Sequence, residues 1–239
     1  MLPKLDIPIY SINLISTGKP VRFRPFLVKE QKLFLMSSES DDPNEMVSII
    51  RQVLKNCIID EINVDSLPTF DLEYLFLNLR ARSVEEIVHL TYKCNNKLEE
   101  DKVCNGVVEF DINLLEIEPT KYENHKNKIM INDKLGVCFK YPTFDMLQKY
   151  ESMDENQIIM KILVDCIDYI FDDEQIYSSK DSSREELEEF VDNLQQKDIE
   201  KFKDFFQTIP QIKKDVSFKC PKCSYEESVE IKGIQSFFV

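Results

Sequence analysis

The stretch Lys219-Cys220-Pro221-Lys222-Cys223-Ser224 places two cysteines in one short turn near the end of the chain. Runs that read as strands lie on both sides of it. A second pair, Cys94 and Cys104, also lies between runs that read as strands. Four thiolates in two strand-flanked turns form the usual ligand set of a structural zinc site. The sequence therefore predicts one Zn²⁺, held by Cys94, Cys104, Cys220 and Cys223.

The two pairs differ in their spacing. Two residues separate Cys220 from Cys223, as in most zinc knuckles, whereas nine separate Cys94 from Cys104. The longer loop is polar, so we expect it to be an exposed lengthening of its knuckle. Asn105-Gly106 offers the left-handed backbone conformations that a knuckle needs, and Ser224 stands where glycine would be commoner.

A single shared site is energetically reasonable although its halves lie far apart in sequence. Closing the loop of about 115 residues between Cys104 and Cys220 costs on the order of 4 kcal/mol. Structural zinc contributes roughly 10–16 kcal/mol in small peptides. Metal binding therefore outweighs the loss of chain entropy.

Other interpretations of the cysteines stay open. Incidental thiols are one, and a disulfide formed after release from the cell is another. Cys220 and Cys223 also match the two-residue spacing of thiol oxidoreductases, which place that motif at the start of a helix. Residues 225–231 read as a strand instead, so the sequence favours structure over redox chemistry. Cys57 falls on the apolar stripe of a predicted helix, which indicates a core thiol.

The composition narrows the class of protein. The chain has 239 residues, 43% of them hydrophobic, and no run approaches the ~18 apolar residues of a membrane-spanning helix. The first residues lack the features of a signal peptide, which favours the cytosol, where paired cysteines bind metal more often than they oxidise. The net charge of −14 disfavours nucleic acid as a partner, and only 4 glycines leave no glycine-rich phosphate loop.

Periodicity predicts alternating short strands and amphipathic helices. The predicted strands are 10–14, 21–26, 84–94, 107–112, 128–131, 137–140, 216–219 and 228–231. The predicted helices are 28–38, 43–58, 67–82, 144–150, 156–171, 183–194 and 198–209, with a polar loop over 172–183. The helix 67–82 is apolar on more than one face, which indicates a buried central position.

These elements predict an α+β fold with an N-terminal β-hairpin and helices, a zinc-ribbon-like β module built from two distant hairpins, and an inserted helical segment. The expected domains are 1–86 for the hairpin and helical region, 87–118 with 212–239 for the discontinuous zinc-ribbon-like module, and 119–211 for a small hairpin and helical insertion.

Few residues suit catalysis. The chain has two histidines: His89, on the strand face opposite Cys94, and His125, in a polar connector. No nucleophile lies in a pattern with a base, so we expect no enzyme and no catalytic residues. Arg22 and Arg24 share a predicted strand face, where they could bind a partner's carboxylates or simply be solvated.

Several stretches together resemble the baseplate hub assembly proteins of T-even-like contractile-tailed bacteriophages. The similarity covers nearly the whole chain and lies in Arg22-Phe23-Arg24-Pro25-Phe26-Leu27-Val28-Lys29-Glu30-Gln31-Lys32-Leu33, residues 70–84, residues 205–210, Cys220-Pro221-Lys222-Cys223 and residues 231–238. The resemblance implies a non-enzymatic role in virion assembly, as a hub subunit or a hub-assembly factor. It implies other baseplate hub proteins of the same phage as partners, no membrane, and a location in the host cytoplasm during assembly or in the tail baseplate.

Two further functions remain as alternatives. The first is a zinc-ribbon transcription or nucleic-acid-binding factor, which would bind DNA or RNA in a salt-sensitive manner. The second is an enzyme that uses Cys220 and Cys223, whose thiols would then have to react rapidly in the metal-bound protein.

Overall fold

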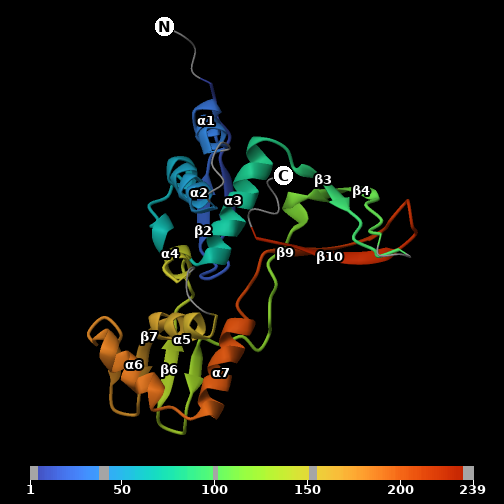
Figure 1. The fold of residues 1–239 in the computed structure, drawn as a ribbon. Helices are drawn as coiled ribbons and strands as arrows, with labels where there is room; N and C mark the ends of the chain where they lie inside the picture. The colour runs from blue at the N-terminus through green and yellow to red at the C-terminus, as the bar shows by residue number, and fades with distance from the viewer. Residues whose placement is uncertain (1–4, 38–42, 99–101, 151–154, 234–239) are drawn as a thin grey trace. The chain divides into compact units, whose positions relative to one another are not determined.

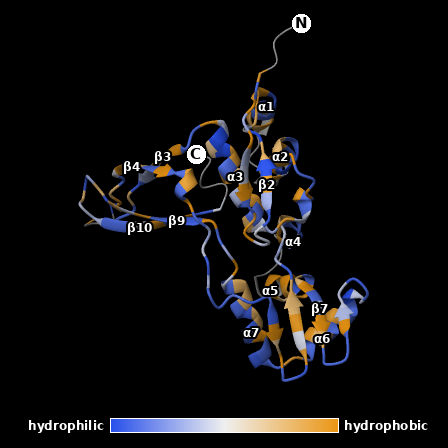
Figure 2. Ribbon diagram, turned by 180° about the vertical axis from the view of Figure 1, so that it is seen from behind, coloured by the Kyte–Doolittle hydropathy of each residue, from blue (hydrophilic) through white to orange (hydrophobic). Residues whose placement is uncertain are grey.

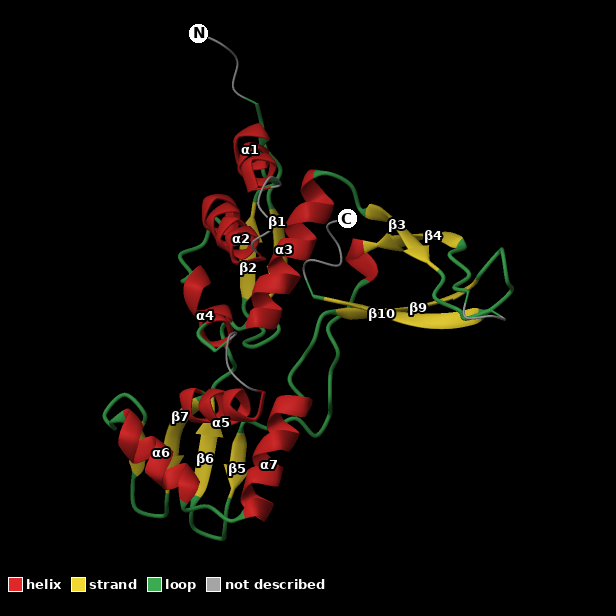
Figure 3. Cartoon of the chain, viewed as in Figure 1, coloured by secondary structure: helices red, strands yellow, loops and turns green. Residues whose placement is uncertain are grey.

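The computed structural model describes residues 5–37, 43–98, 102–150 and 155–233, and within these ranges it confirms the α+β class (Figures 1 and 3). The described elements are seven α-helices and ten strands in small antiparallel sheets. They fold into two compact units. The first unit comprises 1–64, 70–120 and 211–239, and the second comprises 65–69 and 121–210. Within the described ranges no helix is long and apolar enough to span a bilayer.

The first unit begins with the predicted hairpin. Strand β1 (Tyr10–Asn13) pairs antiparallel with β2 (Pro20–Phe23). Three helices follow: α1 (Val28–Ser37), α2 (Pro43–Cys57) and α3 (Thr69–Ser83). Asp41 and Asp42, an acidic pair just before α2 whose position suits a helix cap, lie outside the described residues.

Helix α3 is central, as its lack of a polar face predicted. Nine of its residues are buried: Phe70, Asp71, Leu72, Leu75, Phe76, Leu77, Asn78, Leu79 and Ala81. A helix that is apolar on several faces must be covered on several sides. Two of these residues, Leu77 and Ala81, belong to the cluster that includes both cysteine-bearing hairpins.

The prediction that Arg22 and Arg24 share one strand face was wrong. Strand β2 ends at Phe23, before Arg24. Arg24 donates to the buried carboxylate of Glu30 at 2.9 Å, and Glu30 also accepts from the backbone N–H of Leu27. Arg22 is exposed and pairs with Asp60 at 2.6 Å. Both arginines are therefore engaged within the first unit.

Two long hairpins carry the cysteines. Strand β3 (Ile87–Lys93) pairs with β4 (Val107–Asn113), and β9 (Lys213–Lys219) pairs with β10 (Glu226–Lys232), each in register over seven residue pairs. The two hairpins lie side by side although more than a hundred residues separate them (Figure 1). Their shared core with α3 contains Leu77, Ala81, Val88, Leu90, Ile112, Leu114, Ile117, Ile212 and Ile231.

The second unit contains a sheet of order β5-β6-β7-β8. Its strands are β5 (Lys128–Met130), β6 (Gly136–Phe139), β7 (Ile167–Phe171) and β8 (Ile176–Ser178), and its helices are α4 (Phe144–Gln148), α5 (Glu155–Asp165), α6 (Arg184–Asp192) and α7 (Gln196–Gln207). Hydrophobic residues gather on its central strands (Figure 2). Helix α6 begins with a capping box between Ser183 and Glu186, a pattern of serine followed three residues later by glutamate.

The predicted helix 156–171 was wrong in its last third. Helix α5 ends at Asp165, and Ile167–Phe171 forms β7, which lies between β6 and β8. Cys166, Ile167 and Ile170 match a helical spacing, but they also fit a strand buried in a sheet, and tertiary pairing decides between the two. The predicted loop 172–183 likewise contains β8. The inserted segment is thus a mixed α+β unit rather than a helical one.

The segment 121–210 leaves the first unit after Thr120 and re-enters it at Gln211, and these two residues contact each other. Thr120 donates its backbone N–H to the Gln211 carbonyl at 2.9 Å. Gln211 returns a bond from its backbone N–H to the Thr120 hydroxyl at 2.9 Å. Pro119 and Ile212 form an isolated antiparallel bridge beside them. These contacts close the base of an insertion between β4 and β9.

A buried carboxylate fixes the N-terminal hairpin to α3. Asp71 lies in the first turn of α3 and is fully buried. It accepts the backbone N–H of Ile15 at 2.7 Å, the backbone N–H of Ser16 at 3.3 Å and the Ser16 hydroxyl. Asp71 thus binds the turn between β1 and β2 from a distant element.

Replacing Asp71 by alanine should lower the free energy of unfolding by about 2–4 kcal/mol, because the partly buried donors of Ile15 and Ser16 would lose their acceptor. Denaturant unfolding monitored by circular dichroism measures the change. The same substitution at exposed Asp133 should stay within about 0.5 kcal/mol of the parent. Equal effects of the two variants would contradict this role of Asp71.

Candidate metal centre

The structure brings the four predicted cysteines together. Their Sγ atoms all lie within 4.8 Å of one another, and the group contains no histidine or carboxylate. Cys94 and Cys104 lie at the tip of the β3–β4 hairpin, and Cys220 and Cys223 lie in the turn between β9 and β10. Three of the thiols are buried and Cys223 is half-buried. Each hairpin therefore supplies two sulfur atoms to one shared position.

The spacing of the sulfur atoms suits a tetrahedral metal ion. The Sγ atoms of Cys94 and Cys223 are 3.7 Å apart, and those of Cys104 and Cys220 are 3.8 Å apart. A zinc ion with sulfur at about 2.3 Å in a tetrahedron separates its sulfur atoms by about 3.8 Å. A disulfide would bring a pair to about 2.05 Å, and all four cysteines are free thiols. The donor set and its dimensions fit zinc.

The two turns have the same backbone construction. In the first, Cys94 donates its N–H to the Gly106 carbonyl at 2.8 Å; in the second, Cys220 donates to the Tyr225 carbonyl at 2.8 Å. The residue after the second cysteine of each pair is left-handed: Asn105 has φ 51° and Ser224 has φ 60°. Asparagine enters this region more readily than serine does, because its side chain hydrogen-bonds locally. The prediction of a left-handed residue after Cys104 is confirmed for Asn105.

Gly106 is required for space rather than for a left-handed conformation. A Cβ atom at this position would lie 2.7 Å from the Sγ of Cys220, 2.9 Å from the Cβ of Lys222 and 3.3 Å from the Sγ of Cys104. Contacts under 3 Å force a neighbouring atom to move. The missing side chain therefore allows the second hairpin to approach the first at the cysteines.

The thiols differ in how readily they ionise. A hydrogen bond from the backbone N–H of Tyr225 lowers the pKa of the Cys223 thiol to about 6. The backbone N–H of Asn96 favours the Cys94 thiolate, but burial and the other thiols outweigh it and raise the pKa of Cys94 to about 12. Burial also raises the pKa of Cys104. A cation at the centre is what would hold these buried thiols as thiolates at neutral pH.

Residues that the sequence did not single out surround the cysteines. The Asn96 side chain donates to the Sγ of Cys223 at 3.6 Å, and the Lys222 ammonium donates to the Cys104 carbonyl at 2.6 Å. Phe218 of β9 packs against Tyr92 of β3 at 4.9 Å and against Phe110 of β4 at 6.0 Å between ring centroids. These contacts join the hairpins next to the sulfur atoms. Only the tertiary structure reveals them.

The remaining candidate residues lie elsewhere. His89 is exposed and pairs with Asp111 at 2.6 Å, while His125, in the second unit, contacts Thr208 and Tyr141. Cys57 is buried in the N-terminal core, as predicted. Cys220 and Cys223 are followed by strand β10 and not by a helix, so the structure lacks the helix start that activates thiols in oxidoreductases.

The extra residues of the first turn form a small extension of the hairpin. Lys97 and Val103 make an antiparallel bridge, and Leu98 donates its backbone N–H to the Lys102 carbonyl at 2.8 Å. Both Leu98 and Val103 are exposed. The described residues next to this bridge are therefore an exposed lengthening of the knuckle, as the polarity of the loop predicted, and residues 99–101 lie outside the described ranges.

Two substitutions beside the cysteines should have opposite effects. Gly106→Ala should lower the free energy of unfolding by about 1–3 kcal/mol, because the new Cβ overlaps the Sγ of Cys220. Ser224→Gly should raise it by about 1 kcal/mol, because glycine removes the strain of a left-handed serine. Thermal unfolding of the two variants beside the parent measures both. Two changes of the same sign would contradict the geometry of these turns.

Comparison with known protein families gives a match over nearly the whole chain. A family model described as T4 bacteriophage base plate protein matches residues 7–239. The matched range includes both units and all four cysteines. No curated protein and no solved structure matches the chain significantly.

Proposed function

Because this chain belongs to the family of T4 bacteriophage base plate proteins, we propose that it is a non-enzymatic component of the baseplate hub of a contractile phage tail, acting as a hub subunit or as a hub-assembly factor. The family places the protein among tail components. The hub assignment extends that statement and draws on the similarity in residues 22–33, 70–84, 205–210, 220–223 and 231–238. The partners would be other hub proteins of the same phage.

The observation that carries the molecular part of the proposal is the convergence of four thiols from two distant hairpins. We propose that Cys94, Cys104, Cys220 and Cys223 hold one structural Zn²⁺. Four protein ligands complete a tetrahedron and leave no open position for substrate, which is the pattern of structural rather than catalytic zinc. The ion would supply a fixed cross-link between the β3–β4 and β9–β10 hairpins.

A scaffold of this kind suits a subunit that binds other proteins. The cross-link would hold 87–118 and 212–239 as one zinc-ribbon-like module. The N-terminal region, 1–86, and the insertion, 119–211, would be the other two parts of the chain. We propose these three parts as the functional domains. The contacts at Thr120 and Gln211 support the last boundary, because they pair the two ends of the insertion.

Replacing Cys220 by serine should remove zinc and stability together. We expect the zinc content, measured by atomic absorption, to fall from about one ion per chain to nearly none. The free energy of unfolding should fall by about 4 kcal/mol or more. The folded chain would still pay the entropic cost of closing the loop, but the metal that offsets this cost would be absent.

Cys57→Ser is the matched control, because Cys57 is equally buried but lies in the N-terminal core. It should cost about 1–3 kcal/mol and leave the zinc content unchanged. Loss of zinc from the Cys220 variant with unchanged unfolding would refute the cross-link. Zinc loss from both variants would show that general unfolding releases the metal.

Deleting the gene from the phage should abolish baseplates while the other tail proteins are still made. Electron microscopy of the lysate counts baseplates, and mass spectrometry of purified virions and of assembly intermediates locates the protein. Presence in both fractions would indicate a subunit, and presence in intermediates alone an assembly factor. Intact baseplates in the deletion, or salt-sensitive binding of the purified protein to DNA, would favour the nucleic-acid alternative instead.

A further inference from the structure

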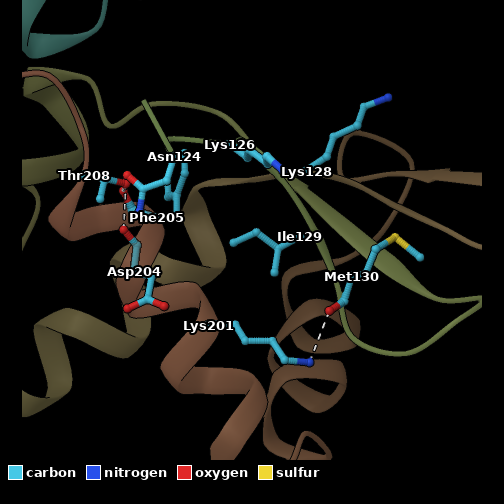
Figure 4. Close-up of a pocket in the computed structure, with 9 residues that line it drawn as sticks. All are labelled: Asn124, Lys126, Lys128, Ile129, Met130, Lys201, Asp204, Phe205 and Thr208. Carbon is cyan, nitrogen blue, oxygen red and sulfur yellow. Dashed lines mark hydrogen bonds between the residues drawn. The ribbon is translucent and has the colours of Figure 1, made fainter. Parts of the chain in front are cut away.

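The second unit has a sheet edge that lies open beside a helix. Strand β5 is the outermost strand on its side of the sheet and pairs only with β6 in the described part of the chain. A groove of about 360 Å³ runs between β5 and α7. Figure 4 shows the residues that line it: Asn124, Lys126, Lys128, Ile129, Met130, Lys201, Asp204, Phe205 and Thr208.

The register of β5 defines which backbone groups face outward. The Asn127 carbonyl accepts from the Phe139 N–H, and the Ile131 N–H donates to the Leu135 carbonyl. Residues alternate in an antiparallel pair, so the backbone of Ile129 also faces β6. The backbone N–H and C=O groups of Lys128 and Met130 therefore point away from the sheet. One of them, the Met130 carbonyl, accepts from the Lys201 ammonium at 3.2 Å.

The side chains of β5 divide between two faces. Ile129 points toward α7 and forms the apolar part of the groove, whereas Lys128 and Met130 point away from the helix (Figure 4). The Lys128 ammonium lies 5.7 Å from the Tyr169 ring centroid on that second face. A strand added to this edge would therefore meet an apolar floor on one face and a lysine on the other.

The charge of this edge is opposite to that of the chain as a whole. Three lysines and one carboxylate, Asp204, line the groove of a protein with net charge −14. Lys201 is engaged by Asp198 at 3.0 Å. Lys126 and Lys128 are exposed and have no carboxylate partner among the described residues. With Lys201 paired to Asp198, Lys126 and Lys128 leave the lining of the groove with an excess of positive charge over Asp204.

From this geometry we propose that the β5 edge binds an extended segment of a partner protein, with alternating acidic and apolar residues, as a fifth strand of the sheet. Addition of a strand to an exposed edge beside a helix is a known mode of peptide recognition. Lysines on an edge strand oppose pairing with a second copy of the same edge, because like charges repel, whereas an acidic strand complements their charge. The identification of the partner as a tail protein rests on the proposed function. The mode of binding is independent of it.

A labelled peptide of about eight residues, alternating glutamate and valine, is the probe, and fluorescence anisotropy with the full-length zinc-loaded chain is the measurement. The double variant Lys126→Glu, Lys128→Glu should weaken binding about tenfold or more, because it places like charges against the peptide. The matched control is Lys180→Glu, Lys203→Glu, two exposed lysines outside the groove, which should change binding less than about twofold.

Backbone methylation of the peptide separates strand addition from simple charge attraction. In an antiparallel pair, residues directly opposite one another have side chains on the same face. Peptide residues that bond Lys128 and Met130 thus carry the glutamates, and the valines face Ile129. Methylating the glutamate nitrogens should abolish binding, whereas methylating the valine nitrogens should leave it nearly unchanged. Equal binding of the two methylated peptides would overturn the proposal.

Hydrogen exchange gives a second measurement that needs no variant. The glutamate–valine peptide should slow exchange at the amides of Lys128 and Met130, which face outward, more than at Ile129. Binding of single-stranded DNA that depends on the same lysines and competes with the peptide would overturn the proposal in favour of a nucleic-acid site. Peptide binding is measured without phage assembly, so the two proposals are tested independently. If the peptide does not bind, the hub proposal still stands. If the hub proposal is wrong, the strand site can still be tested with the peptide.

Discussion

The convergence of four thiols is the constraint on which the first unit depends. Cys94 and Cys104 can meet Cys220 and Cys223 only if about 115 residues of chain leave and return to nearly the same place. The structure meets this requirement at Thr120 and Gln211, whose two hydrogen bonds pair the outgoing and returning segments. The second unit is thus an insertion whose ends are fixed, and the two long hairpins can pack as one module.

Packing and the convergence of the four thiols support the same arrangement. Phe218 lies against Tyr92 and Phe110 beside the sulfur atoms, and Ile231 and Ile212 join the cluster of α3 at the other end of the hairpins. Gly106 gives the close approach that both require. Apolar side chains join the hairpins at the end near α3, and the four cysteines converge at their tips. The relative position of the hairpins is therefore fixed at two points.

The second unit differs in its construction and in what it exposes. Its sheet is stabilised by an ordinary apolar core with α6 and α7, in which Phe139, Phe202 and Phe205 are almost fully buried. One edge of that sheet stays open at β5 and carries lysines on an otherwise acidic chain. We propose that the two units have separate tasks: the first would be a scaffold cross-linked by metal, and the second would offer a surface that selects a partner by strand pairing and charge.

The sequence alone determined the elements whose signals are local. The strand-flanked cysteines, the buried α3, the capping box at Ser183 and the family resemblance all follow from short patterns, and a family match over residues 7–239 agrees with the last of these. Tertiary structure alone decided what depends on distant partners. Residues 167–171 became a strand because β6 and β8 flank them, and Arg24 turned inward to the buried Glu30. Asn96, Lys222 and Gly106 gained roles at the cysteines only because a hairpin more than a hundred residues away packs against them, and no local pattern encodes such a contact.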